Sequence, residues 1–168
     1  MRHILATAAT TLLLFFCAAT AGAQTLSTRF ACSLASDDGG DPITYADTGE
    51  IDLDGATVKT FRWESAIFRS THGYDCNIDD DDGLKAEVRG EGSTAAWRVA
   101  LKDGGAARLK RGYNFERGLN CTIRLERDGN TVHVKPTCPA LCGSRINFSD
   151  IAIDLDSGTC RYDQAGKP

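Results

Sequence analysis

The sequence is short of long apolar runs, basic charge and histidine, and each shortage argues against a class of protein. After the first 23 residues, no apolar stretch reaches the about 18 residues that a membrane-spanning helix needs. Basic residues number 19 against 23 acidic ones, so nucleic acid is not an expected partner. Of three histidines only His72 and His133 lie beyond the N-terminal segment, and neither sits in a recognisable catalytic motif.

The N-terminus has the pattern of an export signal. Arg2 and His3 provide a short basic start, an apolar run follows from Leu12 to Ala19, and Ala21-Gly22-Ala23 has the small-x-small form of a cleavage site. We therefore predict a cleavable signal peptide over 1–23 and a single β-rich domain over 24–168. A mature chain of this length fits one domain, and we expect it to be periplasmic or secreted.

Cysteines support this location. Cys17 lies in the expected signal peptide, and the six that remain form an even set in an oxidising compartment, so three disulfides are expected. Six cysteines allow 15 pairings. Our predicted set joins Cys32 to Cys160, Cys76 to Cys121, and Cys138 to Cys142.

Charge is unevenly distributed along the chain. Removal of Arg2 with the signal leaves 18 basic residues against 23 acidic ones, a net charge of −5. Acidic residues dominate the first part of the mature chain: Asp37, Asp38, Asp41, Asp47, Glu50, Asp52, Asp54, Glu64, Asp75 and Asp79 to Asp82. Basic residues crowd the middle: Arg98, Lys102, Arg108, Lys110, Arg111, Arg117, Arg124 and Arg127.

Short alternating segments separated by Gly and Asp predict strands, and no convincing helical period runs longer than about three turns. The clearest unit is a hairpin over 121–135, in which Ile123 and Leu125 face Val132 and Val134 across an Asp128-Gly129 turn. Cys121 shares the apolar face of that hairpin and should point inward.

Further alternation predicts a second hairpin over 84–101 with Trp97 as a core anchor, strands around 51–63, and another over 151–155. The expected fold is all-β: a single antiparallel sandwich or barrel of about seven to eight strands, stapled by disulfides.

Two metal sites are conceivable from the sequence and neither is predicted. The acidic loop 79–82 resembles a calcium loop, but counting from Asn77 puts Asp82 and Val88 where an EF-hand needs glycine and glutamate. Zinc ligands could come from His72, Cys76, Cys138 and Cys142, yet oxidised cysteines supply no thiolate. We expect no metal and no cofactor.

His72 and Tyr74 are the better functional candidates among the ring-bearing residues. They lie in Ser70-Thr-His-Gly-Tyr-Asp75, next to an expected disulfide at Cys76. A titratable ring and an aromatic ring on a rigid loop suit the binding of a partner. His133 falls on the polar face of its strand, which indicates a structural role.

The segment Cys138-Pro-Ala-Leu-Cys142-Gly-Ser-Arg145, followed by Phe148 and a strand that closes at Cys160, resembles the cysteine-rich end of small periplasmic proteobacterial proteins associated with lysozyme inhibition. The resemblance covers about 40 residues. It implies a non-catalytic, β-rich domain that blocks a wall-degrading enzyme, with matching positions at Cys138, Cys142, Gly143 and Arg145.

The functional hypothesis is therefore an exported binding protein that inhibits, or gives immunity to, a cationic wall-lytic enzyme. Arg145, His72 and Tyr74 are its expected contacts, because an arginine on a disulfide loop can enter an acidic cleft. The alternatives are a secreted hydrolase of unknown class, which requires a deep pocket with a carboxylate of raised pKa, and a structural envelope protein.

Overall fold

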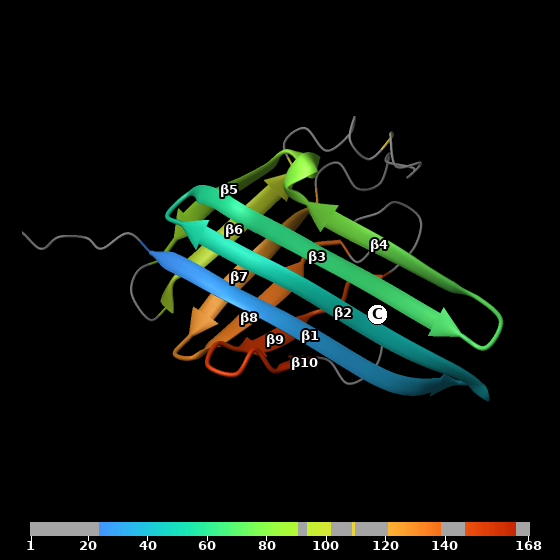
Figure 1. Cartoon of the computed structure of the whole chain (residues 1–168). Coiled ribbons are helices and arrows are strands. Elements are labelled where there is room, and N and C mark those ends of the chain that lie inside the picture. Colours follow the sequence, from blue (N-terminus) through green and yellow to red (C-terminus); the bar gives the residue numbers. More distant parts are fainter. Residues whose placement is uncertain (1–23, 91–93, 102–108, 110–120, 139–146, 164–168) are drawn as a thin grey trace, which may run out of the picture.

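Two antiparallel sheets, with ten strands between them, make up the described part of the chain (Figure 1). The computed structural model describes residues 24–90, 94–101, 109, 121–138 and 147–163. The expected signal peptide over 1–23 and the candidate contact Arg145 lie outside these residues. No helix in the described ranges is long and apolar enough to cross a membrane.

The first sheet is a four-stranded meander in which each strand pairs with the next. Its first three strands are 14, 14 and 13 residues long, well above the common length of about five or six. At roughly 3.4 Å per residue they span roughly 45 Å. The strands are β1 (Thr25–Asp38), β2 (Asp41–Asp54), β3 (Thr57–Arg69) and β4 (Gly73–Asp79).

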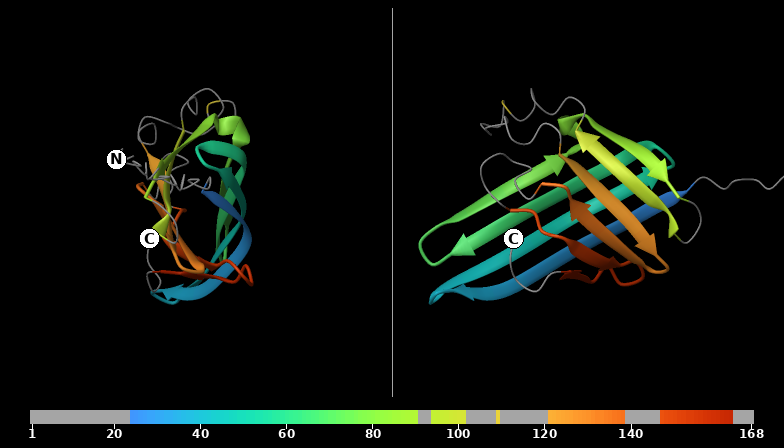
Figure 2. Two further views of the ribbon diagram at one scale, coloured as in Figure 1. Left: turned by 90° about the vertical axis from the view of Figure 1, so that its left-hand side faces the viewer. Right: turned by 180° about the vertical axis from the view of Figure 1, so that it is seen from behind.

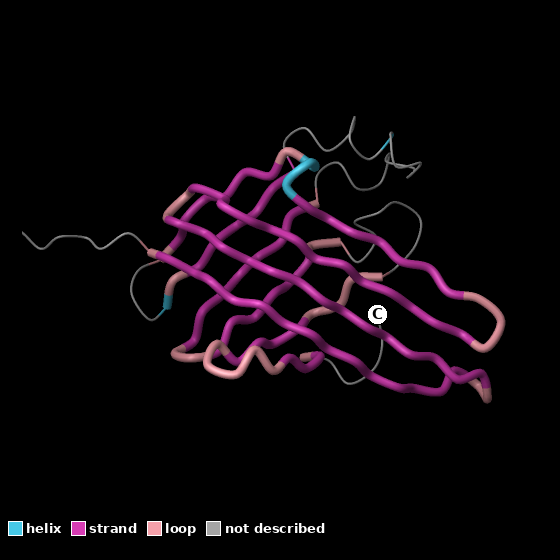
Figure 3. The backbone as a smooth tube through the Cα atoms, viewed as in Figure 1, coloured by secondary structure: helices cyan, strands magenta, loops and turns pink. Residues whose placement is uncertain are grey.

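The second sheet has six shorter strands in the order β10-β9-β8-β7-β6-β5. The 3-10 turn η1 (Asp80–Asp82) leads from β4 into it. Because the strands of this sheet are short, the four-stranded sheet extends past them at one end (Figures 1 and 3). The strands are β5 (Leu84–Arg89), β6 (Ala96–Leu101), β7 (Thr122–Asp128), β8 (Thr131–Pro136), β9 (Ile151–Asp154) and β10 (Cys160–Tyr162).

The predicted all-β class is confirmed, and the predicted count of seven to eight strands is wrong. The prediction missed strands with weak hydrophobic contrast: β1 alternates Leu26 and Phe30 with small polar residues but places Thr28 on the buried face, and β10 is only three residues long. The two sheets face each other as two layers (Figure 2), and they do not close into a barrel.

Both predicted hairpins are present. β7 pairs with β8, and its two-residue turn lies at Gly129-Asn130, one residue later than predicted. β5 pairs with β6, and Trp97 is buried in the core as expected. The predicted strands around 51–63 belong to β2 and β3, and the one at 151–155 is β9.

The core lies between the two sheets and draws on both. Trp63 of β3 packs edge-on against Phe148, with ring centroids 4.7 Å apart, and also against Phe30 at 6.5 Å. Trp97 of β6 packs in the same cluster and donates its indole N–H to the carbonyl of Gly55 at 3.1 Å. Aliphatic side chains complete the core: Leu26, Ile51, Leu53, Ile78, Val99, Ile123, Leu125, Val132, Val134, Ile151 and Ile153.

Two disulfides join described cysteines. The predicted Cys32–Cys160 bond is confirmed, and it ties β1 to β10 with a Cα–Cα distance of 4.9 Å. Cys121 bonds Cys138 instead of Cys76, at a Cα–Cα distance of 5.5 Å. The predicted Cys76–Cys121 and Cys138–Cys142 pairs are therefore wrong.

The reason for the second pairing is the register of the β7–β8 hairpin. Ile123 lies opposite Pro136, and the same register continued outward brings Cys121 opposite Cys138. A hydrogen bond of 2.8 Å from the amide of Thr137 to the carbonyl of Thr122 extends the ladder. Cys76 is also disulfide-bonded, and Cys142 lies outside the described residues. Disulfide bonding fits an exported protein.

Candidate binding site

The hairpin between β3 and β4 forms one end of the long sheet, and its turn is visible as the loop that extends furthest in Figure 3. The amide of Arg69 donates to the carbonyl of His72 at 2.8 Å, which closes the turn through Ser70 and Thr71. We call Phe68, Ser70, Thr71, His72 and Tyr74 the hairpin tip.

The hairpin tip is held to the neighbouring turn between β1 and β2. Asp41, at the start of β2, accepts hydrogen bonds from the Ser70 hydroxyl at 2.7 Å and from the Arg69 guanidinium at 3.3 Å. The Ser70 hydrogen bond, followed by the Arg69 interaction, lowers the pKa of the Asp41 carboxyl. Two turns that are remote in sequence thus meet around one carboxylate, which limits the freedom of the tip.

The structure brings together two of the predicted contacts, His72 and Tyr74. Their rings lie 5.5 Å apart between centroids at an interplanar angle of 40°. The Thr71 hydroxyl lies 2.8 Å from Nδ1 of His72 and orients the imidazole. His72 is exposed and Tyr74 is half-buried. The pair therefore offers an exposed imidazole ring beside a tyrosine ring that is partly fixed by the sheet.

Phe68 is a tip residue that sequence reasoning missed. Its side chain is 53% exposed, although large apolar side chains usually pack inward. It lies opposite Gly73 on the outer face of the sheet, and a β-carbon at Gly73 would come within 3.0 Å of the phenylalanine ring. An aromatic residue at the end of a strand, opposite a glycine, was the available indication in the sequence.

The rings of the hairpin tip are distributed over both faces of the hairpin. Phe68 is on the outer face, whereas Tyr74 lies opposite buried Ile67 and shares its inner face. Such a protrusion can contact both walls of a cleft that it enters. The arrangement therefore suits insertion into a groove on a partner better than apposition to a flat surface.

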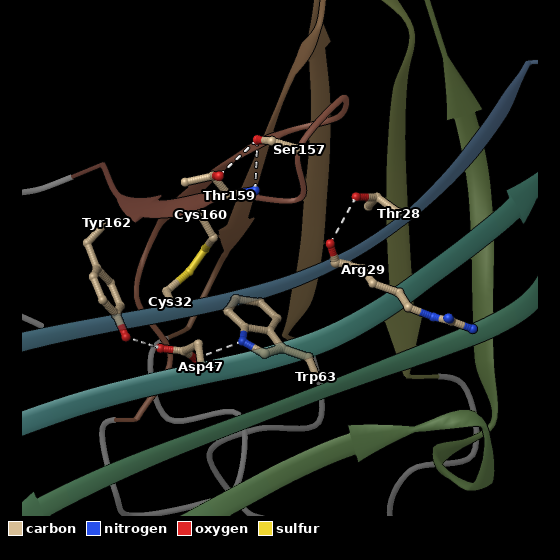
Figure 4. Close-up of a disulfide and its surroundings, with 9 residues drawn as sticks. All are labelled: Thr28, Arg29, Cys32, Asp47, Trp63, Ser157, Thr159, Cys160 and Tyr162. Atoms are coloured by element: carbon tan, nitrogen blue, oxygen red, sulfur yellow. Dashed lines mark hydrogen bonds between the residues drawn. A yellow bond between two sulfur atoms is a disulfide. The ribbon is translucent and has the colours of Figure 1, made fainter.

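A buried carboxylate of raised pKa exists, but it is not accessible to a substrate. Asp47 on β2 is 1% exposed and accepts hydrogen bonds from the indole N–H of Trp63 at 2.8 Å and the hydroxyl of Tyr162 at 2.7 Å (Figure 4). Burial raises the pKa of Asp47 and also, with the charge of Asp47, that of Tyr162. Because Tyr162 belongs to β10, this network joins the two sheets.

Asp47 is part of a polar row across the inner face of the four-stranded sheet. In register, Cys32, Asp47, Ser65 and Cys76 lie side by side on β1 to β4, with a disulfide-bonded cysteine at each end. Ser65 donates its hydroxyl to the backbone carbonyl of Asn147 at 2.8 Å. Such a row is a structural frame that positions the hairpin tip beyond it.

The acidic loop 79–82 uses its carboxylates for backbone hydrogen bonds. Asp79 caps η1 by accepting the amide of Asp81 at 3.0 Å, while Asp82 accepts the amide of Asp79 at 3.1 Å. Asp80 accepts the amide of Phe61 at 2.8 Å, and Gly83 ends the turn at φ +65°. The run of aspartates is therefore explained by hydrogen bonds from these carboxylates to backbone amides, which stabilise the turn.

The outer face and the β4 edge of the four-stranded sheet are acidic. Arg29 is paired with Glu50 at 2.8 Å, and Lys59 with Asp54 at 3.0 Å, so these cations are neutralised locally. Further outward-facing acids lie on β2 to β4 and in η1: Asp52, Glu64, Asp75, Asp79, Asp80 and Asp81. The acidic part of the sequence thus becomes one side of the molecule.

The other sequence candidates lie elsewhere. His133 projects from the outer face of β8, where Nδ1 lies 2.6 Å from the carboxylate of Asp163, far along the chain from the hairpin tip. No group of described residues forms a cluster of three or more metal-ligating side chains. Arg145 is not among the described residues, so its position relative to His72 and Tyr74 stays a prediction.

Compared with protein-family models, with curated proteins and with solved structures, the chain matches none of them.

Proposed function

We propose that the mature chain is an exported, non-catalytic binding protein, periplasmic or secreted, that inhibits or gives immunity to a lysozyme-like enzyme. The observation that carries the proposal is the hairpin tip: an exposed Phe68 and the adjacent, mutually tilted rings of His72 and Tyr74, at the end of a sheet whose strands extend past the opposite layer. Aromatic anchors on a rigid protrusion are typical of binding hot spots.

Rigidity supports this assignment as much as exposure does. The tip is fixed by Asp41 at its turn and by the polar row and its disulfide-bonded cysteines further along the strands. A loop that is already ordered loses little conformational entropy when it binds, so more of the contact energy appears as affinity.

Charge supports the choice of partner. The outer face of the four-stranded sheet is acidic, with Asp75 beside the hairpin tip and most of the other acids toward the opposite end of the sheet. An enzyme that acts on anionic cell walls carries a positive surface. Opposite potentials raise the association rate and orient the encounter. Arg145, by resemblance, is proposed as an additional contact for the acidic catalytic cleft of the same enzyme.

The test is an inhibition assay with the oxidised mature chain and a cationic lysozyme acting on purified peptidoglycan. We expect saturable inhibition, and we expect F68A/H72A/Y74A to weaken it by about 30-fold, the loss of one binding hot spot. V88A is the matched control, because Val88 is an exposed apolar residue on the other sheet. All variants should keep the thermal melting temperature of the parent domain within a few degrees.

Three results separate the parts of the proposal. Absence of both inhibition and binding would remove the inhibitor function. Inhibition that survives F68A/H72A/Y74A but is lost in R145A would keep the function and move the contact away from the hairpin tip. Equal loss in the triple variant and in V88A would mean that the assay reports stability instead of contact.

A further inference from the structure

The outer face of the six-stranded sheet carries a row of charged side chains that cross-strand register brings together. Glu87 of β5 lies opposite Arg98 of β6, Arg98 lies opposite Arg124 of β7, and Arg124 lies opposite Lys135 of β8. Their sequence neighbours Val99, Ile123, Leu125 and Val134 are buried, so the four charged side chains point outward.

Three adjacent cations in one row are an unfavourable arrangement for a sheet. Residues directly opposite on antiparallel strands have β-carbons about 5 Å apart, and like charges at that separation destabilise the pairing. The two glutamates nearby are already engaged: Glu126 pairs with Lys135 at 2.8 Å, and Glu87 is shared at 3.6 Å with Arg98 and at 3.7 Å with Arg89. No ion pair of Arg124 is found among the described residues.

We propose that the guanidinium groups of Arg98 and Arg124, two residues that lie opposite each other on β6 and β7, form a binding site for a phosphate group. Each guanidinium presents a planar fork of donors that matches the oxygens of an oxyanion. A phosphate group has enough acceptor oxygens to receive hydrogen bonds from two such forks at once. The ligand would offset the repulsion between the two arginines, which Glu87 beside Arg98 and Glu126 near Arg124 reduce.

This site lies on the opposite side of the sandwich from the acidic face that carries the hairpin tip (Figure 2). A phosphate group bound at Arg98 and Arg124 would therefore leave the hairpin tip free to bind its partner. The phosphate can come from free solution or from a lipid headgroup, and both sources use the same two side chains.

The first experiment is a titration of the oxidised mature chain with inorganic phosphate at low ionic strength, followed by NMR of the arginine side chains. We expect saturable shifts at Arg98 and Arg124, and we expect R98A/R124A to weaken phosphate binding by about tenfold or more. R62A is the matched control, since Arg62 is an exposed arginine on the outer face of the four-stranded sheet. The variant R98K/R124K should have a phosphate affinity between those of the parent and R98A/R124A, because lysines keep the positive charge but lack the planar fork of donors.

The second experiment uses sedimentation with vesicles of phosphatidylcholine alone and with phosphatidylglycerol added. Binding to the anionic vesicles that is lost in R98A/R124A and kept in R62A assigns the phosphate to a lipid. Saturable free-phosphate binding with the same variant dependence, and no vesicle binding, assigns it to a soluble ligand. Absence of both, or equal weakening in R62A and R98A/R124A, overturns the site. Either result stands apart from the lysozyme assay, which does not involve this face.

Discussion

Replacement of Asp47 should reveal how much the buried network contributes to the joining of the two sheets. In D47A the indole N–H of Trp63, a residue that is 0% exposed, loses the acceptor Asp47, and the hydroxyl of Tyr162 loses the same partner. An orphaned buried donor costs about 1–3 kcal/mol and a partly exposed hydrogen bond about 1 kcal/mol. D47A should therefore lower the free energy of unfolding by about 2–4 kcal/mol.

D47N is the control that separates hydrogen bonding from charge. Its carbonyl oxygen can still accept from Trp63, and its amide can donate to the hydroxyl of Tyr162, which rotates to accept. We expect D47N to cost no more than about 1 kcal/mol near neutral pH. Urea unfolding with the disulfides intact, monitored by tryptophan fluorescence, gives the free energy of unfolding of the parent, D47A and D47N.

The pH dependence of the same comparison tests the state of the carboxyl group. Burial raises the pKa of Asp47 above its ordinary value of 3.8, so the folded chain binds that proton more tightly than the unfolded chain does. The stabilisation from the protonated Asp47 is complete at pH values below the pKa of this carboxyl in the unfolded chain. It is lost as the pH rises through the pKa of the same carboxyl in the folded chain. D47N has no such titration, so the stability advantage of the parent over D47N should shrink as pH rises through that window.

Two results would refute this reasoning. A cost of D47A that equals the cost of D47N would mean that the acceptors at position 47 do not matter. A parent advantage over D47N that grows with rising pH would mean that the ionised carboxylate is favoured by the fold, contrary to the effect of burial.

Two further predictions concern the disulfides and the close packing of the four-stranded sheet. The Cys32–Cys160 bond closes a sequence separation of 128, and the Cys121–Cys138 bond closes one of 17. In the entropic account, C32A/C160A should therefore lose more stability in urea unfolding than C121A/C138A, by about 1 kcal/mol or more. The reverse order would show that strand register already constrains the ends joined by Cys32–Cys160. G49A places a β-carbon within 2.5 Å of a backbone oxygen of β3 and should cost about 1–3 kcal/mol; an unchanged melting temperature would contradict this close approach.

The alternation of residues by itself determined the all-β class, both predicted hairpins and the burial of Trp97 and Cys121, because the period-two pattern of a strand is a local property. The export signal and the even number of cysteines that follow it predicted disulfide bonding. The Cys121–Cys138 bond could also have been predicted from the sequence, because it follows from the register of the β7–β8 hairpin. A turn misplaced by one residue, at Asp128-Gly129 instead of Gly129-Asn130, shifts every cross-strand partner and obscures that pair.

Only the tertiary structure decided which distant segments meet. The joining of Asp47 to Tyr162, the support of the hairpin tip by Asp41, and the opposition of Arg98 to Arg124 depend on strand order and register across residues far apart in sequence. Phe68 shows the same limit, because its side chain lies on the outer face of β3, which the second sheet does not cover. Its exposure is set by which face of the sheet the second layer covers, and the tertiary structure decides that.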